Sequence, residues 1–311
     1  MNLQQLRYLI AIVDHGLNIS DAAEALFTSQ PGISKQVRQL EDELGVAIFI
    51  RRGKRLTGLT EPGRLVVERA RRLVIEAAGL KQIGDEHRAR DEGSLIIATT
   101  HTQARYVLPP SIKQFTVRFP RVRLLLHQGN PVLVAEYVVK GEADLGIATE
   151  SLAIAPALVT LPCYQWNRCV IMPHSHPLAQ EKRLTIEALA RYPIVTYDDS
   201  FTGASAITAA FSARGMVPNI ALTALDADVI KTYVDLGLGV GIIAQMAYDP
   251  ARDSAFAMLP ADHLFEPSTT RLALRRGAYL RSYTYDFIAL FAPHLTRQAI
   301  DTALNGSAPQ H

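Results

Sequence analysis

The sequence is poor in cysteine, in tryptophan and in long apolar runs. Only two of its 311 residues are cysteine, Cys163 and Cys169, which is too few for a disulfide framework. Neither further cysteines nor clustered histidines accompany them, so we predict reduced thiols in a strand and no metal site. No apolar run approaches the ~20 residues that a membrane span requires, and we therefore expect a soluble protein.

The chain also lacks a strong excess of charge of either sign. Lysine and arginine number 32 and aspartate and glutamate 30, a formal net charge of +2, so the composition alone does not indicate a nucleic-acid binder. Hydrophobic residues make up 48% and charged residues 20%, which excludes a disordered chain. The apolar residues 8–13 are too few for a secretory signal, so we expect a cytoplasmic protein. At about 150 residues per domain, the length predicts about two domains.

Three short helices are predicted in the first 45 residues. Asn18 or Ser20 is a candidate cap for the second helix, and Ser29 followed by Pro31 begins the third, which Gly45 ends. Apolar residues at steps of three and four mark the inner faces. These faces are Leu3, Leu6, Ile10 and Val13; Ile19, Ala22, Ala23 and Leu26; and Ile33, Val37, Leu40 and Leu44. Three helices with a tight turn before the last form a helix-turn-helix.

The outer face of the third helix carries side chains that can reach base edges or phosphates in a major groove. Glu41, Asp42 and Glu43 at its far end would be repelled by phosphate, so we place its N-terminal half in the groove. Residues 49–60 then form two extended segments around Gly53, rich in basic side chains. Such a run is more often a solvated hairpin, but beside a helix-turn-helix we favour a wing. The predicted DNA-binding residues are Ser29, Gln30, Pro31, Ser34, Lys35, Arg38, Arg51, Arg52 and Lys54.

A long helix is predicted from Glu61 to near Gly84, followed by a polar hinge at residues 85–93. Apolar residues alternate along it at steps of four and three, which forms a heptad seam. The seam consists of Val66, Ala70, Leu73, Ala77 and Leu80. It is compatible with a helix lying on its own domain and with pairing to a second chain. Pairing is favoured because a helix-turn-helix normally binds two half-sites.

Beyond Gly93 the sequence alternates strands and helices in two successive sets, which predicts an α/β domain of two lobes with parallel sheets. Ligands in such lobes bind outside the carboxyl ends of the strands. Three of these ends are rich in hydroxyls: residues 99–103, residues 196–203 and Thr149. Hydroxyls and backbone N–H groups can surround a sulfate or carboxylate without a formal positive charge. Any one threonine could merely cap a helix, but the three ends together favour a binding site.

Other motifs give no catalytic site. The glycine-rich residues 237–241 precede a strand, whereas a dinucleotide fingerprint follows one, so we assign them no ligand. His101 could act as a general base, but the sequence places no nucleophile and orienting carboxylate beside it, so we predict a polar pocket residue or a helix cap. Tyr164 and Trp166 are predicted to be core or lobe-edge aromatics. We predict no catalytic residue and no cofactor.

With these residues in hand, the chain resembles the LysR-type transcriptional regulators over its whole length. The block AAEALFTSQPGISKQVRQLEDELGVAIFIR is similar to the winged helix-turn-helix of that family. Several segments look like the CysB-like subfamily of cysteine-regulon activators, which includes relatives that control sulfonate use: ATTHTQARYVLP, HQGNP, LPCYQWNR, DADVIKTYVDLGLGVGIIA and LRSYTYDFIALFAPHLTR. The resemblance implies an α/β chain that is not an enzyme. It implies a homotetramer that binds promoter DNA, with RNA polymerase as a possible further partner.

The resemblance also implies an organisation and an effector cleft. We expect a winged helix-turn-helix at residues 1–60, a linker helix at 61–90 and a periplasmic-binding-protein-like domain at 91–305. Its lobe I would comprise residues 91–163 and 267–300, and its lobe II residues 164–266. The cleft between them would hold sulfate or an acetylserine-like inducer. The positions that match are Thr100, Thr102, Gln103, Thr149 and Thr202.

The sequence departs from the subfamily pattern at one loop. Where the subfamily has Gly-Phe-Thr-Gly-Arg, this chain has Ser200 to Ala204, preceded by Asp198 and Asp199. The loss of an arginine and the gain of two carboxylates are expected to weaken the binding of a fully anionic ligand. The competing hypothesis is a small-molecule enzyme or a transport-type solute-binding protein that uses the same two-lobed cleft.

Overall fold

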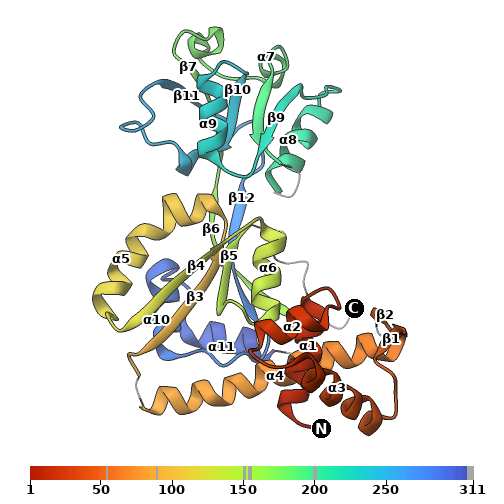
Figure 1. Ribbon diagram of the computed structural model, residues 1–311. Coiled ribbons are helices and arrows are strands. Elements are labelled where there is room, and N and C mark those ends of the chain that lie inside the picture. Colours follow the sequence, from red (N-terminus) through yellow and green to blue (C-terminus); the bar gives the residue numbers. More distant parts are fainter. Residues whose placement is uncertain (54, 89, 150–151, 153–155, 199–201, 307–311) are drawn as a thin grey trace. The chain divides into compact units, whose positions relative to one another are not determined.

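The computed structural model describes residues 1–53, 55–88, 90–149, 152, 156–198 and 202–306, without the side chains of 85–87 and 202–205. The chain divides into two compact units, Met1–Asp85 and Glu86–His311, whose elements are labelled in Figure 1. None of the described helices combines the length and the apolar character that crossing a membrane requires.

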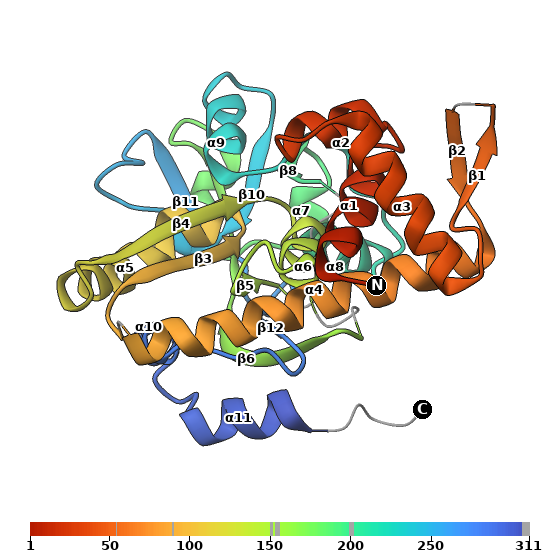
Figure 2. The same ribbon diagram turned by 60° about the horizontal axis from the view of Figure 1, so that its bottom comes forward.

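The first unit contains three short helices, a hairpin and one long helix (Figure 2). The elements are α1 (Leu3–Asp14), α2 (Ile19–Ala25), α3 (Gln30–Leu44), β1 (Phe49–Arg52), β2 (Arg55–Leu59) and α4 (Glu61–Arg88). Asn18 and Ser29 cap α2 and α3 by accepting hydrogen bonds from backbone N–H groups of the first turn. Gly45 ends α3 in the left-handed conformation, with φ of 67°. The predicted helix-turn-helix with its hairpin is confirmed.

The core of this unit differs from the prediction at three leucines. At the ends of α2 and α3, Leu26 and Leu44, which we predicted to be buried, are 36% and 39% exposed. The third leucine is on α1. The buried face of this helix runs through Leu6, Leu9 and Ile12, whereas Leu3, which we predicted to be buried, is 42% exposed. Apolar residues occupy two neighbouring faces of α1, so steps of three and four did not distinguish them. Ile10 and Val13 pack only partly against the core.

The long helix α4 changes character along its length. Ala70 is buried and Val66 packs against the core of the first unit, whereas Leu73 is 48% and Leu80 72% exposed. The first half of the heptad seam therefore packs against the core of the first unit, whereas the leucines of the second half are exposed. The predicted end near Gly84 was wrong, since α4 continues to Arg88. A glycine costs a helix only about 1 kcal/mol relative to alanine and does not by itself end it.

The second unit has two lobes, each built on a five-stranded sheet. Lobe I has the strand order β4-β3-β5-β12-β6, and lobe II has β11-β7-β10-β8-β9. The strands of lobe I are β3 (Gly93–Thr99), β4 (Val122–Gln128), β5 (Leu145–Ala148), β6 (Leu158–Trp166) and β12 (Ser268–Arg275). Those of lobe II are β7 (Arg168–Pro173), β8 (Ile194–Tyr197), β9 (Ile220–Ala224), β10 (Val240–Ala244) and β11 (Phe256–Pro260).

Helices cover these sheets. Lobe I carries η1 (Gln103–Val107), which is a π-helical turn, α5 (Leu108–Arg118), α6 (Pro131–Lys140), α10 (Ser282–Phe291) and α11 (Arg297–Asn305). Lobe II carries η3 (Pro177–Gln180), α7 (Ile186–Leu189), α8 (Thr202–Ser212), α9 (Ala227–Asp235) and η4 (Gln245–Ala247). Helical backbone in lobe I already starts at His101, directly after the end of β3 and Thr100.

The sheets are mixed rather than wholly parallel. Parallel pairing, as predicted, joins β4, β3 and β5 in lobe I and β10, β8 and β9 in lobe II. However, β12 runs antiparallel to β5 and β6, and β7 runs antiparallel to β10 and β11. The chain crosses between the lobes from β6 to β7 and returns from β11 to β12 (Figure 1). The predicted change of lobe after residue 163 falls inside β6, and the domain boundaries after residues 60 and 90 stay predictions.

A candidate nucleic-acid surface and an interlobe pocket

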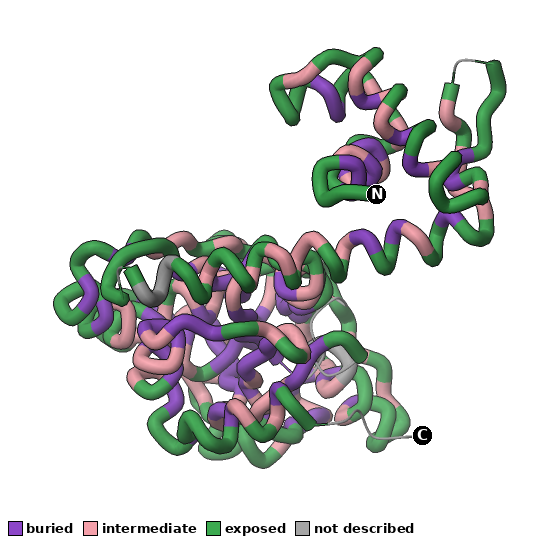
Figure 3. Tube along the Cα trace, turned by 90° about the horizontal axis from the view of Figure 1, so that it is seen from below, coloured by how far each residue is buried: buried purple, intermediate pink, exposed green. Residues whose placement is uncertain are grey.

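The residues predicted to face DNA lie along α3 and the wing formed by β1 and β2. Five of those around the start of α3 are exposed, namely Ser29, Gln30, Pro31, Lys35 and Arg38. Ser34 is half-buried and its hydroxyl accepts a hydrogen bond from the Gln30 amide at 3.3 Å. Residues 50–53 of the wing are exposed, whereas β2 mixes exposed and half-buried residues, as the green and pink stretches of Figure 3 show. The basic side chains of α3, Lys35 and Arg38, are therefore accessible from solvent.

The acidic end of α3 has a role that the sequence did not reveal. Glu41 accepts hydrogen bonds from the backbone N–H groups of Ile48 at 2.8 Å and Phe49 at 3.1 Å. Its second oxygen lies 2.7 Å from the Arg51 guanidinium. Glu41 therefore holds the backbone at the start of the wing in place. Its negative charge also partly neutralises that of Arg51. Arg52 is exposed, and Lys54 lies outside the described residues.

A small pocket lies between the two lobes of the second unit. Its volume is about 30 Å³, and it is lined by Thr100, Thr102, Gln103, Thr149, Trp166, Tyr197 and Ala244. These lining residues, all in the described part of the chain, carry no charged side chain. Four of the five residues predicted to hold an effector meet here. The fifth, Thr202, is the first residue of α8, and its side chain lies outside those described.

Lobe I contributes hydrogen-bond donors at the start of a helix. The first helical hydrogen bond there runs from the Ala104 N–H to the Thr100 carbonyl, so the N–H groups of the preceding turn have no partner within the helix. The positive end of the helix dipole lies at the same place. Gln103 is 2% exposed, and its amide donates to the Thr270 hydroxyl at 3.1 Å while the Tyr164 hydroxyl donates to its carbonyl oxygen. A primary amide has two N–H groups, and the Thr270 hydroxyl accepts only one of them.

Two aromatic residues also line the pocket. Tyr197 lies in the strand end at residues 196–203 that the sequence indicated, whereas Trp166 was not predicted to bind a ligand. Trp166, which we expected to be a core or edge aromatic, lines the pocket, and its buried indole N–H finds no hydrogen-bond partner within the described residues. Burial raises the pKa of Tyr197 to about 12, although hydrogen bonds with the Ala244 N–H and with Thr102 act in the opposite direction. Trp166 is the last residue of β6 and Tyr197 the last of β8, and Thr149 directly follows β5. The strand-end rule, applied to aromatic residues, also predicts Trp166.

The two cysteines are buried, Cys163 on β6 and Cys169 on β7. Burial raises the pKa of each thiol to about 12. Because the thiolate is the reactive form, both side chains are poor nucleophiles at neutral pH.

The chain matches two family descriptions that together cover most of its length. Residues 3–64 match "Bacterial regulatory helix-turn-helix protein, lysR family", and residues 88–296 match "LysR substrate binding domain". The chain belongs to the LysR family of transcriptional regulators. Residues 88–296 are accordingly the part of this LysR-family chain that takes a small-molecule effector.

Similar proteins cover nearly the full length of this LysR-family chain. It is 54% identical to the HTH-type transcriptional regulator SsuR of Burkholderia cenocepacia over 300 residues, 96% of this chain and 97% of that protein. It is 50% identical to the HTH-type transcriptional regulator CysB of the same organism over 311 residues, 100% of this chain and 99% of that protein. The competing hypothesis of an enzyme or a solute-binding protein finds no support in these relatives, which are transcriptional regulators.

A solved structure of similar sequence supports the fold of the second unit. It is the crystal structure of the cofactor-binding domain of the Cbl transcriptional regulator, with 44% identity and a TM-score of 0.67. The similarity covers 70% of this chain and 95% of that one. The predicted fold, an N-terminal helix-turn-helix followed by a two-lobed α/β effector domain, is confirmed.

Proposed function

We propose that this regulator binds promoters of genes for sulfur assimilation or sulfonate use, and that a small sulfur oxyanion held between its lobes controls it. The similarity to CysB, SsuR and Cbl over nearly the whole chain or the whole effector domain supports the sulfur regulon. The observation that carries the effector proposal is the pocket itself, with hydroxyl, amide, indole and backbone N–H donors and no charged lining residue in the described part.

The size of the pocket favours a compact effector. A volume of about 30 Å³ suits about two water molecules, so a compact ion such as sulfate suits this pocket better than the longer acetylserine. Neutral donors can hold an anion without burying a cation, whose desolvation is costly. Asp198 is not among the lining residues, and Asp199 to Phe201 lie outside those described. We predicted that these carboxylates would repel an anion, but none of them is among the described residues that line the pocket.

The sole tryptophan of the sequence offers a direct test. Because Trp166 lines the pocket, its fluorescence should change as an effector enters. We would titrate sulfate, thiosulfate, acetylserine, adenosine phosphosulfate and an alkylsulfonate into the wild type and Thr100→Ala. Thr116→Ala is a matched control on the exposed surface of α5. We expect at least one sulfur compound to bind the wild type and the control about tenfold more tightly than Thr100→Ala. Equal affinity in all three proteins would exclude the pocket.

The proposed DNA contacts come from the N-terminal half of α3 and from the wing. Ser29, Gln30, Pro31, Ser34, Lys35 and Arg38 would contact bases and phosphates of a major groove, and Arg51, Arg52 and Lys54 mainly phosphates. The exposure of Lys35, Arg38 and Arg52 supports this assignment.

The proposed oligomer pairs two chains through the second half of α4. A groove of about 490 Å³ lies beside it, lined by Met1, Asn2, Leu3, Leu6, Leu73, Glu76, Ala77 and Leu80. Its exposed leucines support a partner helix there, and a dimer would place two reading heads on two half-sites. A dimer of dimers, a contact with RNA polymerase and action in the cytoplasm complete the proposal and rest on the resemblance to CysB-like regulators.

A further inference from the structure

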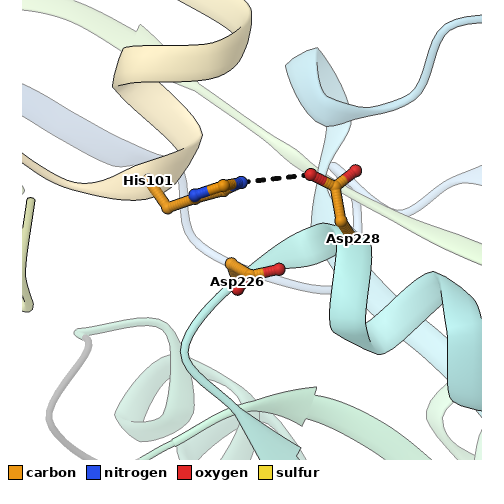
Figure 4. A group of neighbouring side chains, drawn as sticks. All are labelled: His101, Asp226 and Asp228. Atoms are coloured by element: carbon orange, nitrogen blue, oxygen red, sulfur yellow. Dashed lines mark hydrogen bonds and ion pairs between the residues drawn. The ribbon is translucent and has the colours of Figure 1, made fainter.

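A carboxylate of lobe II is held by three side chains of lobe I. Asp228 lies in the first turn of α9, and one of its oxygens is 3.0 Å from Nε2 of His101 (Figure 4) and 2.8 Å from Nε of Arg105. Its other oxygen accepts a hydrogen bond from the Tyr106 hydroxyl at 2.6 Å. Burial alone would raise the pKa of Asp228, but the hydrogen bonds from Tyr106 and His101 and the charge of Arg105 outweigh it and lower the pKa. The carboxylate is therefore ionised at neutral pH.

The contact continues into the interior of lobe II. The ring of Tyr106 packs against a core cluster of lobe II, and Nζ of Lys231 lies 5.1 Å from its centroid. Lys231 donates to the Tyr106 hydroxyl at 3.3 Å and to Asp253 at 2.6 Å. Both Lys231 and Asp253 are 8% exposed. A lobe I side chain is thus anchored to a buried ion pair of the other lobe.

The segment that makes these contacts is also one wall of the pocket. Thr100, Thr102 and Gln103 line the pocket, while His101, Arg105 and Tyr106 hold Asp228. The backbone between them is π-helical from Gln103 to Val107. Such turns are rare and occur frequently at functional sites. A shift of this segment on effector binding would move both groups of side chains together.

We propose that Asp228 is a positioning residue, which holds the lobes closed over the pocket through His101, Arg105 and Tyr106 and so couples effector binding to lobe closure. The coupling rests on the proposed effector site, whereas the closure does not. A closed pocket presents donors from both lobes, so the effector binds the closed form more tightly than an open one. Asp228 itself touches no effector, and its loss shifts the balance toward the open form.

The same cluster has a second chemical interpretation, as a cation site. Ligand atoms of His101, Asp226 and Asp228 lie within 4.8 Å of one another (Figure 4). However, Arg105 already neutralises Asp228, and Asp226 accepts the Val229 N–H at 2.9 Å as the cap of α9. A cation would therefore compete with a positive charge already in place, and we favour the interlobe contact.

Two neighbouring variants separate these roles. Asp228→Asn removes the charge that His101 and Arg105 hold. Asp226→Asn is the matched control on the same turn, because asparagine still caps a helix. Tyr106→Phe removes only the hydroxyl and retains the packing. The full-length protein is used throughout, and its single tryptophan, Trp166, reports on the pocket.

Acrylamide quenching of Trp166 without effector tests closure alone. We expect the quenching constant to rise about twofold in Asp228→Asn and Tyr106→Phe and to stay at the wild-type value in Asp226→Asn. Wild-type quenching in Asp228→Asn would overturn the proposal. Because no effector is added, failure of the effector assignment does not affect this result.

Effector titration then tests the coupling. With the sulfur compound that binds the wild type best, Asp228→Asn should bind about tenfold more weakly and Asp226→Asn about as the wild type does. Raised quenching with unchanged affinity would refute the coupling. If no compound binds even the wild type, the proposed function fails, while the quenching result still decides closure. A thermal shift by zinc chloride that both asparagine variants abolish would replace the interlobe contact with a metal site.

Discussion

The two candidate binding surfaces of this chain differ in the charge and the exposure of their side chains. Around α3 and the wing, Lys35, Arg38 and Arg52 are exposed, and residues 29–72 carry ten basic against five acidic side chains, a local +5 that leaves −3 for the remaining chain. The interlobe pocket has only uncharged lining residues in its described part. Exposed cations need no desolvation and suit a large polyanion, whereas burying a cation for one small ion is costly.

The largest expected effect concerns the proposed pairing of two chains, which would join their helix-turn-helix domains. Leu80→Glu places a charge on the exposed part of the α4 seam and should prevent pairing of the chains. Because two linked heads bind far more tightly than one, promoter affinity should fall by about 100-fold. Sedimentation velocity and promoter titration measure the two effects.

The matched control for Leu80 is Leu65→Glu. Leu65 is also exposed on α4, at 62%, but lies outside the seam, so this variant should keep the wild-type mass and affinity. If Leu80→Glu sediments as the wild type and binds DNA equally well, the assigned pairing surface is wrong.

Removing one neutral donor should have the next largest effect. Trp166→Phe retains an aromatic ring and loses the indole N–H that has no partner within the described residues. The lost hydrogen bond to an anion should weaken effector binding about tenfold, as measured by calorimetry. A promoter affinity equal to that of the wild type, without effector, is the internal control. Unchanged effector affinity would remove the indole from the site.

Single wing arginines should produce smaller changes that depend on their partners. Arg52→Ala removes one exposed cation, so the slope of log affinity against log salt should fall by about 0.9. Arg51→Ala should lower it less, because Glu41 already shares the Arg51 charge at 2.7 Å. Promoter titrations over a range of potassium chloride concentrations measure both slopes. A larger loss for Arg51 than for Arg52 would contradict this ranking.

The thiols should give the smallest effect. Burial raises the pKa of Cys163 and Cys169 to about 12, so both stay in the thiol form at neutral pH. We expect no reaction with a thiol-specific disulfide reagent in the native protein and two equivalents after denaturation. Rapid native modification that changes promoter affinity would instead indicate a redox-sensitive regulator.

The same comparison separates what the sequence could predict from what it could not. The helix-turn-helix was readable because its signals are local: Asn18 and Ser29 cap helices within their own turn, and Gly45 supplies a left-handed end. Residues 99–103 and Thr149 were indicated because ends of parallel strands meet at one edge of a sheet, and the family resemblance singled out Thr100, Thr102, Gln103 and Thr149. Their roles as binding residues stay predictions.

The remaining features depend on contacts between distant segments. Trp166 and Tyr197 reach the pocket only because the chain crosses between the lobes after β6, and the antiparallel β12 arises from the return crossing. The pairing of Asp228 with His101 joins residues 127 positions apart, and no local pattern marks it. Glu41 was interpreted only as repelling phosphate, but its carboxylate accepts hydrogen bonds from the backbone at the start of the wing.

One measurement tests the contrast between the two surfaces directly. Promoter affinity and effector affinity are determined on the same full-length preparation at about 50 and about 200 mM potassium chloride. Exposed lysines and arginines release counterions, so promoter affinity should fall by about 1000-fold or more. The pocket, whose described lining is uncharged, should change its effector affinity by less than about twofold. An effector affinity that falls in parallel with promoter affinity would contradict recognition by neutral donors.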